Sequence, residues 1–378
     1  MKRIVIKIGS GILTQTNGSL DKLTISNLAK DICLIKKENE IEVVIVTSGA
    51  VSVGSATVNL DNTKIEKEAI DYSEYILKEQ ILASVGQPIV ISAWLDECKK
   101  NGVKCAQLLT TRTDFALRNN YLSIRSVVAN LLKLGVIPIF NENDVLSPNR
   151  LDFTDNDQQA CMIAAMVSAD KLIILSDVDG VYDGPPNNQE SKIIKTIQKA
   201  TDFIEHVEMD SGSGKGGMKS KLMAADLATS MGIDTHIANG KTPFIISQVL
   251  NDNNNHGTYF PSHVKKGKLK PIKSWLTASA TSQGKITVST YLADILKNKK
   301  VVSVLLAGIE ACSDTFNEGE IVDIYDDHNN KLARGIVRFN AKKLKEKIID
   351  YKKTAKNNNP IKKSDTETII HYDYLIYY

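Results

Sequence analysis

The alternation of short apolar runs with helix-length amphipathic stretches is the feature that most restricts the fold of this chain. Strands are predicted at residues 3–8, 43–46, 103–109, 136–140, 171–176, 234–238 and 244–249, and helices at 23–38, 68–84, 87–100, 120–134, 157–168 and 219–231. Strands separated by helices pair in parallel, and helices must then cover both faces of the sheet. The sequence therefore predicts an α/β domain on a mostly parallel sheet, with ligands beyond the carboxyl ends of the strands.

The composition changes after this alternating region. An Asn- and Asp-rich loop at 251–257 and a lysine-rich stretch at 265–270 precede short β-like runs at 286–290, 301–305, 320–325 and 332–338. From these changes we predict three segments: a catalytic domain at 1–258, a basic linker at 259–280 and a small β-rich domain at 281–378.

The two ends of the chain also differ in charge. Residues 1–262 hold 26 basic and 31 acidic side chains, a net charge of −5, whereas residues 263–378 hold 21 and 13, a net charge of +8. A basic C-terminal part suits either a polyanionic partner or ordinary solubilising surface charge.

Cysteine usage and hydropathy predict a cytoplasmic protein. The five cysteines are widely spaced and form no Cys-x-x-Cys pair, so neither a disulfide framework nor a zinc site is indicated. The first residues are too charged for a signal peptide, and no apolar run approaches the roughly 18 residues of a membrane span. We expect no association with membranes.

Two glycine-containing segments are candidate phosphate sites. Lys7-Ile8-Gly9-Ser10-Gly11 ends a predicted strand, and its glycines would let backbone N–H groups approach an anion. Its spacing is not that of a P-loop, and a bare tight turn is the other interpretation. Gly212 to Lys221 leads into a helix, where Lys221 would bring a second positive charge to a transferring phosphoryl group; a plain flexible loop has the same composition.

Polar residues follow three further predicted strands. Thr47-Ser48-Gly49 either holds a ligand anion at a helix N-terminus or uses Ser48 as an N-cap. Asn141-Glu142-Asn143-Asp144 and Asp155-Asn156-Asp157 lie together within 17 residues. Such residues also occur in ordinary turns and helix caps, but their density here favours a site that binds an ammonium group and orients lysines or Mg²⁺-nucleotide. Ser176 to Tyr182 suits nucleotide contact or, through Asp179-Gly180, a hairpin turn.

The chemistry of these segments fits a carboxylate as phosphoryl acceptor. None of the six histidines lies in them. A side-chain carboxyl with a pKa of about 4 is already ionised at neutral pH, so no general base is required. Two lysines, backbone N–H groups and Mg²⁺ can neutralise the charge on the transferring group. The residues therefore predict an ATP-dependent kinase for a small carboxylate metabolite.

Taken together and in this order, the segments resemble those of the amino acid kinase family and, within it, of the glutamate 5-kinases. The succession of Asn-Glu-Asn-Asp and Asp-Asn-Asp is the most specific part, and the resemblance covers nearly the whole chain. It implies an open αβα sandwich and the ATP-dependent phosphorylation of the L-glutamate side-chain carboxylate to glutamyl 5-phosphate, the first step of proline biosynthesis. It also implies Mg²⁺ dependence without a metal site made by protein ligands alone, a homodimer or homotetramer, proline inhibition, and coupling to a glutamyl-phosphate reductase.

The resemblance further implies roles for individual residues. Transition-state stabilisation falls to two lysines and one aspartate that organises them: Lys7, Lys221 and Asp157. The residues that would hold glutamate are Ser48, Asp144 and Asn156. Those that would contact ATP are Lys7, Gly9, Ser176, Asp177, Lys215, Gly216, Gly217, Met218, Lys219, Ser220 and Lys221.

The C-terminal part is similar to the PUA domain, a module that binds RNA in other proteins. The similarity rests on Ile286-Thr287-Val288 and on Leu332 to Val337, whereas Ser289 to Leu292 depart from the usual Asp and Gly-Ala. In the kinase part, Thr154 stands where glycine is common and Gly184-Pro185-Pro186 replaces a common Thr-x-Asp-Pro. None of these departures removes a proposed catalytic group.

Two other functions are compatible with parts of the sequence. Another member of the family would phosphorylate aspartate, N-acetylglutamate, carbamate or a nucleoside monophosphate, which the Asn-Glu-Asn-Asp segment disfavours. An RNA-binding regulatory protein would use the basic C-terminal domain and keep the kinase fold as a remnant, which the intact Lys7 and Lys221 disfavour.

Overall fold

A computed structural model gives the conformation of most of the chain. It describes residues 2–38, 41–60, 74–146, 156–185, 188, 190–208, 217–252, 255–262, 273, 276–277, 282–356 and 367–378. Two compact units are present, Met1–Arg112 with Ser123–Lys268, and Thr113–Leu122 with Leu269–Tyr378. The division at 258 and 280 drawn from the sequence stays a proposal.

The first unit is built on a seven-stranded sheet with the order β3-β4-β2-β1-β5-β6-β7. Its strands are β1 (Arg3–Ile8), β2 (Glu42–Val46), β3 (Cys105–Thr110), β4 (Ile137–Glu142), β5 (Lys171–Ser176), β6 (Asp234–Asn239) and β7 (Thr258–Phe260). The first six pair in parallel, and β7 runs antiparallel to β6. The predicted, mostly parallel sheet is confirmed.

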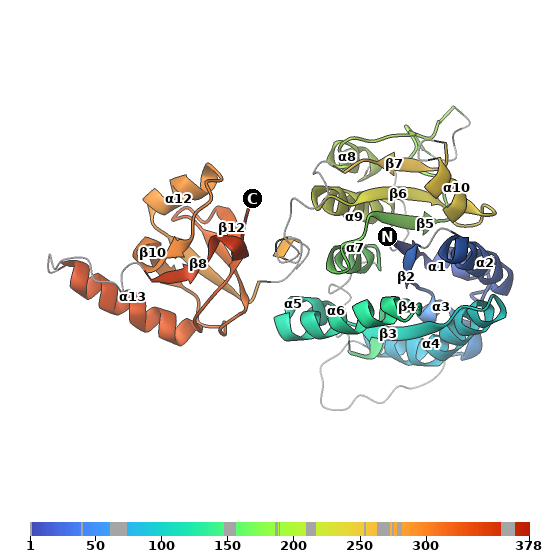
Figure 1. The fold of residues 1–378 in the computed structure, drawn as a ribbon, viewed down its shortest axis with the longest axis horizontal. Helices are drawn as coiled ribbons and strands as arrows, with labels where there is room; N and C mark the ends of the chain where they lie inside the picture. The colour runs from blue at the N-terminus through green and yellow to red at the C-terminus, as the bar shows by residue number, and fades with distance from the viewer. Residues whose placement is uncertain are drawn as a thin grey trace. The chain divides into compact units, whose positions relative to one another are not determined.

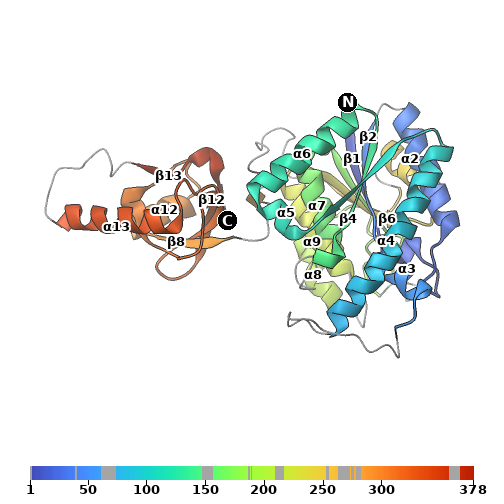
Figure 2. The same cartoon turned by 90° about the horizontal axis from the view of Figure 1, so that it is seen from below.

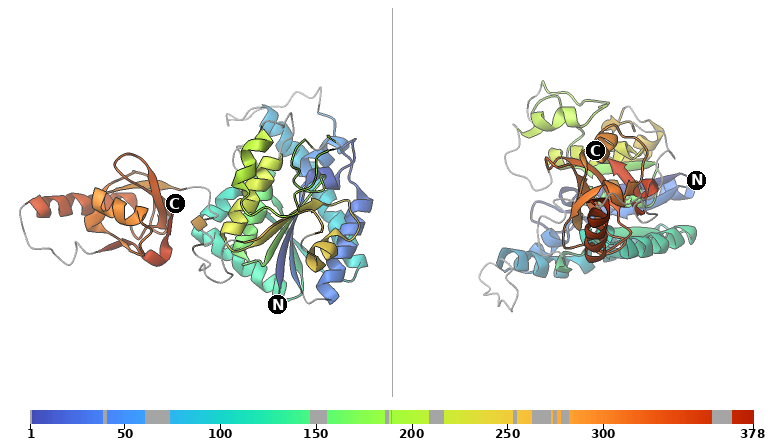
Figure 3. Two further views of the ribbon diagram at one scale, coloured as in Figure 1. Left: turned by 90° about the horizontal axis from the view of Figure 1, so that it is seen from above. Right: turned by 90° about the vertical axis from the view of Figure 1, so that its left-hand side faces the viewer.

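Helices cover both faces of this sheet, as Figures 1 and 2 show. One face carries α1 (Ser10–Leu13), α2 (Lys22–Glu38), α3 (Ala50–Thr57), α4 (Glu74–Lys100) and α10 (Ile245–Asn251). The other carries the part of α6 (Arg118–Lys133) that follows Leu122, together with α7 (Asn156–Met166), α8 (Thr201–Glu208) and α9 (Met218–Ser230). Seen along the sheet edge, the strands lie between two helical layers (Figure 3). The predicted open αβα sandwich is therefore confirmed.

The predicted strand at 244–249 is wrong, because this segment forms α10. Ile245, Ile246 and Val249 are buried along one side of the helix, a spacing that a short apolar run shares with a buried strand. The carboxylate of Asp31, in α2, accepts hydrogen bonds from the backbone N–H groups of Ile246 (2.8 Å) and Ser247 (3.3 Å). A partner 215 residues away thus satisfies the first turn of α10.

The two helices predicted at 68–84 and 87–100 form one helix where the structure describes them. α4 continues through Pro88, whose ring removes one backbone hydrogen bond without ending the helix. Residues 68–73 lie outside the described part of the chain. The sequence also gave no signal for β7, which adds an antiparallel edge strand after the Asn-rich loop.

Helices α3 and α4 touch through their backbones. A Cβ atom added to Gly86 would lie 1.9 Å from the carbonyl oxygen of Ala50, and one added to Gly54 would lie 1.8 Å from that of Leu82. Real Cβ atoms do not approach so closely, so both positions require glycine. The start of α3, directly after Ser48 and Gly49, is consequently held in place by α4.

The second unit is β-rich, as predicted, and has its own apolar core. A five-stranded sheet has the order β10-β8-β11-β12-β14, and β13 pairs with β9. The strands are β8 (Gly284–Val288), β9 (Val304–Leu305), β10 (Ile309–Cys312), β11 (Ile321–Tyr325), β12 (Lys331–Ile336), β13 (Thr368–Ile370) and β14 (Leu375–Tyr377). The helices α12 (Thr290–Lys297) and α13 (Ala341–Lys356) also lie in this unit, and Thr113–Leu122, which spans most of α5 (Arg112–Ala116) and the start of α6, is grouped with it.

The sequence departure at Ser289 to Leu292 has a local structural role. Ser289 is the N-cap of α12, and its hydroxyl accepts a hydrogen bond from the backbone N–H of Leu292 at 3.4 Å.

No helix in the described part of the chain is both long and apolar enough to cross a lipid bilayer.

Candidate active site

Two lysines and one aspartate meet in the interior of the first unit. Lys7, on β1, places its Nζ 2.6 Å from Asp157 Oδ1, and Lys221, on α9, places its Nζ 3.3 Å from Asp157 Oδ2. Asp157 is fully buried and the lysines are 3% and 7% exposed. Buried charges are stable only when paired, and Asp157 pairs with both lysines. The structure thus brings together the three residues that the sequence assigned to transition-state stabilisation.

The positions of these charged side chains in the first turns of α7 and α9 indicate which kind of ligand the site favours. Asp157 lies in the first turn of α7, where a carboxylate is favourable for the helix dipole. Lys219 and Lys221 lie in the corresponding part of α9, where a cation is unfavourable and an acidic side chain is absent from the first turn. A bound phosphate would reverse this disadvantage, because a helix N-terminus and two lysines all favour an anion.

Of the glycine-rich segment from Gly212 to Lys221, the described part of the chain includes residues 217–221. Gly217 is the N-cap of α9, Met218 and Ser220 are partly buried, and Lys219 is exposed. Lys215 and Gly216 lie outside the described residues, as does Thr154. Their roles therefore stay predictions.

Asn156, directly before Asp157, connects the ends of two strands, β2 and β4. Its Nδ2 donates to Ser48 Oγ at 2.7 Å, to the carbonyl of Thr47 at 2.9 Å and to Asn141 Oδ1 at 3.3 Å. The N-cap interpretation of Ser48 is wrong, because Gly49 occupies that position with φ 97°, a left-handed conformation that favours glycine. Ser48 and Asn156, two of the predicted glutamate contacts, are thus direct neighbours.

The glycine turn after β1 is held against β5. Gly9 donates its backbone N–H to the carbonyl of Leu175 at 3.2 Å, so this N–H is already used within the fold. A Cβ added to Gly11 would lie 3.4 Å from Asp177 Oδ2, which places the turn beside the next predicted nucleotide contacts. Ser176 Oγ donates to the same carboxylate at 3.1 Å. The contact of Gly9 with the nucleotide stays a prediction.

The segment after β5 is anchored to β6 and β7. Asn239 Nδ2 donates to Asp179 Oδ1 at 2.8 Å, and Val181 donates its backbone N–H to Thr258 Oγ1 at 2.8 Å. Gly180 does not have the positive φ of a tight Asp-Gly hairpin turn. The Asp179-Gly180 pair instead holds the loop next to Ser176.

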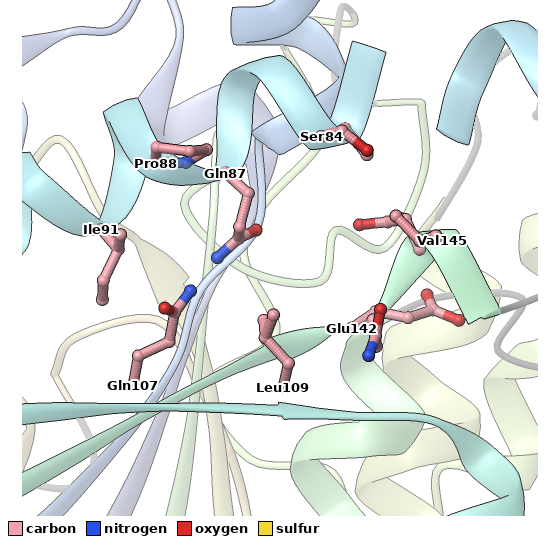
Figure 4. A pocket seen from close by; sticks show the side chains of 11 residues that line it. Ser84, Gln87, Pro88, Ile91, Gln107, Leu109, Glu142 and Val145 are labelled. Carbon is pink, nitrogen blue, oxygen red and sulfur yellow. The ribbon is translucent and has the colours of Figure 1, made fainter. Parts of the chain in front are cut away.

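Asp144 lies in a short 3₁₀ turn, η1 (Asp144–Leu146), and lines a cavity of about 350 Å³ between α4 and the ends of β3 and β4. Figure 4 shows this cavity with Gln87 and Gln107 on its walls. Burial raises the pKa of Asp144 to about 6, and the neighbouring Glu79 carboxylate adds to the rise. A carboxylate so destabilised in the free protein gains most from a cationic ligand.

Three residues near the site were given no individual role from the sequence, although Asn141 belongs to the Asn-Glu-Asn-Asp segment. Asn141, the penultimate residue of β4, bonds Asn156; Asn239 ends β6 and bonds Asp179; and Gln87 lies in the middle of α4. The two asparagines carried a signal, since each is the polar residue at a strand end. Gln87 carried none, because a glutamine inside an amphipathic helix is ordinary.

The residues suit the phosphates of a nucleotide better than a metal cage. The buried lysines and the start of α9 favour phosphate oxygens. Among the described residues, no three His, Cys, Asp or Glu side chains lie close enough together to hold a metal ion.

Comparisons with known proteins agree with this geometry. A model of the amino acid kinase family matches residues 2–239, and a model of the PUA domain matches residues 284–361. The chain is 32% identical over 364 residues to a glutamate 5-kinase of Thermoanaerobacter sp., covering 93% of this chain and 94% of that one. It is 30% identical over 377 residues to a glutamate 5-kinase of Bacteroides thetaiotaomicron, covering 99% and 98%.

A solved structure of a UMP kinase from Bacillus anthracis superposes with a TM-score of 0.48 at 18% identity, over 70% of this chain and 97% of that one. The family assignment rests on the sequence matches, which span both units. The chain belongs to the amino acid kinase family and carries a PUA domain in its C-terminal part.

Proposed function

We propose that this chain transfers the γ-phosphoryl group of ATP to the side-chain carboxylate of L-glutamate, producing glutamyl 5-phosphate for proline biosynthesis. The observation that supports the kinase chemistry most strongly is the buried trio of Lys7, Asp157 and Lys221. The choice of glutamate is supported by relatives named glutamate 5-kinase over nearly the whole chain.

The lysines act on the phosphoryl group in this mechanism. A carboxylate oxygen of glutamate forms a bond to the γ-phosphorus while the bond from that phosphorus to the bridging oxygen of ADP breaks, and no proton needs to be removed. Lys7 and Lys221 neutralise the charge on the transferring oxygens, and Asp157 fixes the position of both ammonium groups. Mg²⁺, when bound to the nucleotide, supplies further neutralisation of the β- and γ-phosphate oxygens.

The acceptor is held beside Asp157. Ser48 and Asn156 lie next to each other, and Asn156 directly precedes Asp157, which suits contact with the reacting end of glutamate. Asp144, further along the same edge of the sheet, suits the α-ammonium group. The acceptor would therefore extend from Asn156 towards the cavity at Asp144.

Four further features belong to this proposal: Mg²⁺ carried in with ATP, a homodimer or homotetramer, delivery of the labile acyl phosphate to a glutamyl-phosphate reductase, and a cytoplasmic site of action. All five cysteines are free thiols, which fits a reducing compartment.

The direct test is turnover by the purified full-length chain. With ATP, Mg²⁺ and L-glutamate we expect ADP release and a product that hydroxylamine traps as a hydroxamate. Aspartate, N-acetylglutamate, carbamate and UMP serve as matched acceptors. Turnover with one of these and none with glutamate would replace the proposed substrate.

The pH dependence of glutamate use tests the role of Asp144. Its pKa in the free protein lies near 6, so below that pH the carboxyl group is neutral and cannot attract an ammonium group. We expect kcat/KM for glutamate to be level above pH 7 and to fall about tenfold per pH unit below 6. The Asp144→Asn variant should bind glutamate weakly at every pH and lack this fall. An identical profile in both proteins would exclude Asp144 as the ammonium partner.

A further inference from the structure

Gln87 is held rigidly at the inner wall of the cavity that Asp144 lines. Its neighbour Gly86 touches the backbone of α3, where an added Cβ would lie 1.9 Å from the carbonyl of Ala50. Pro88 follows directly and fixes its own backbone φ. The backbone of Gln87 is therefore fixed on both sides, and its side chain enters the cavity from α4 (Figure 4).

The amide of Gln87 is oriented by the residues around Asn156. Asn156 Nδ2 donates to Asn141 Oδ1 at 3.3 Å, which leaves Asn141 Nδ2 to donate to Gln87 Oε1 at 2.5 Å. Because Oε1 faces Asn141, Nε2 faces the other way. Gln87 thus belongs to one chain of hydrogen bonds that runs through Asn141 and Asn156 to Ser48.

The Nε2 group of Gln87 is buried and has no hydrogen-bond partner among the described residues. A buried N–H group without an acceptor lowers the stability of the folded protein, and in native proteins such a group usually binds a ligand or a water molecule. The cavity beside it, about 350 Å³, is within the range of small-molecule pockets. An acceptor on a bound ligand would satisfy the group.

The charges on the cavity wall determine where the α-ammonium group and the α-carboxylate of a bound amino acid would lie. Asp144 and Glu142 are acidic and repel a carboxylate, while they attract an ammonium group. Gln87 offers a neutral, buried donor on the α4 side of the same cavity. Ser84 and Gln107 also line the cavity, but they are exposed to solvent. Because water already hydrogen-bonds to exposed donors, they gain less than Gln87 from binding a ligand carboxylate.

We propose that Gln87 determines specificity for the α-carboxylate of the acceptor by donating a hydrogen bond to it from Nε2, while Oε1 positions Asn141. This inference rests on the proposed function, since it assigns the α-end of glutamate to the cavity. Asp144 then takes the α-ammonium group, Gln87 the α-carboxylate, and Ser48 with Asn156 the side-chain carboxylate that reacts.

The test exchanges donor and acceptor on both sides of this contact. Gln87→Glu keeps an oxygen for Asn141 and replaces the donor by a carboxylate. The probe compounds are L-glutamate and its α-amide, which keeps the reacting carboxylate and has a donor where glutamate has an acceptor. At pH 8 we expect the ratio of kcat/KM for glutamate to that for the α-amide to fall at least about 100-fold in the variant, through KM, with KM for ATP unchanged.

A matched control is Ser92→Glu, which adds the same charge to an exposed position of α4 outside the cavity lining and should leave the ratio as in the wild type. If Gln87→Glu does not fold, Gln87→Met provides a second test, because methionine offers neither the donor nor the acceptor of the amide. In this variant the ratio of kcat/KM for glutamate to that for the α-amide should be close to one. The ratio of the binding affinities of the two compounds, measured by calorimetry, should also be close to one. Wild-type turnover of glutamate with an unchanged ratio in the variants would overturn this inference alone. Absence of wild-type turnover with glutamate would overturn the proposed function and this inference with it.

Discussion

Replacing Lys221 by alanine is expected to lower kcat by about 10²- to 10³-fold, with a change of less than about tenfold in KM for ATP. The Nζ atom of Lys221 is buried beside Asp157, where a positive charge interacts strongly with charge that develops during transfer. Steady-state kinetics with varied ATP, together with nucleotide binding by calorimetry, separate the effect on the transition state from the effect on binding.

Two variants complete this experiment. Lys221→Arg keeps the charge but changes its geometry, and it should recover only part of the rate. Lys99→Ala removes an exposed lysine at the end of α4 and should leave kcat unchanged. If Lys221→Ala turned over at a rate close to wild type, Lys221 would have no part in stabilising the transition state.

Replacing Gly86 by alanine is expected to destabilise the first unit by about 3 kcal/mol or more. The added methyl group would overlap the carbonyl of Ala50 and come within 2.7 Å of the backbone nitrogen of Gly54, and backbone atoms cannot move aside as a flexible side chain can. α3 must then shift away from α4, and Ser48 with it. We therefore also expect kcat/KM for glutamate to fall more than kcat/KM for ATP.

Urea denaturation followed by tryptophan fluorescence measures the loss, because Trp94 lies buried in α4 and donates a hydrogen bond to Thr47 at 3.1 Å. Gly54→Ala should act in the same direction, since its added Cβ would lie 1.8 Å from the carbonyl of Leu82. Ser92→Ala, on the exposed side of α4, is the neutral control. A Gly86→Ala protein as stable as the wild type would show that the two helices can separate at no cost.

Local sequence patterns were sufficient to predict most of the fold. Runs such as Ile4 to Ile8 and Leu172 to Leu175 are buried on both faces of a parallel sheet. Their nearly continuous apolar composition, without alternating polar residues, is typical of such strands. The prediction was wrong at 244–249, where one apolar run fits a strand and a helix equally well. The contact with Asp31 that favours the helix comes from a segment 215 residues away, and no local pattern contains it.

For the site, the sequence determined which residue types end each strand, because polar and glycine residues stand out after apolar runs. Lys7 and Ser48 were found in this way, whereas Asn156, Asp157 and Lys221 were found in polar or glycine-rich segments at the starts of predicted helices. Their roles in catalysis and binding stay predictions, which the experiments above address.

Only the tertiary structure decided which of these residues act together. Lys7 and Asp157 are 150 positions apart, yet they form a 2.6 Å ion pair because β1 and α7 meet inside the sandwich. Gln87 became visible only when its amide was seen bonded to Asn141 on one side and without a partner on the other. Periodicity and motif content are local properties of a chain, whereas the pairing of buried charges and donors depends on the packing of distant segments.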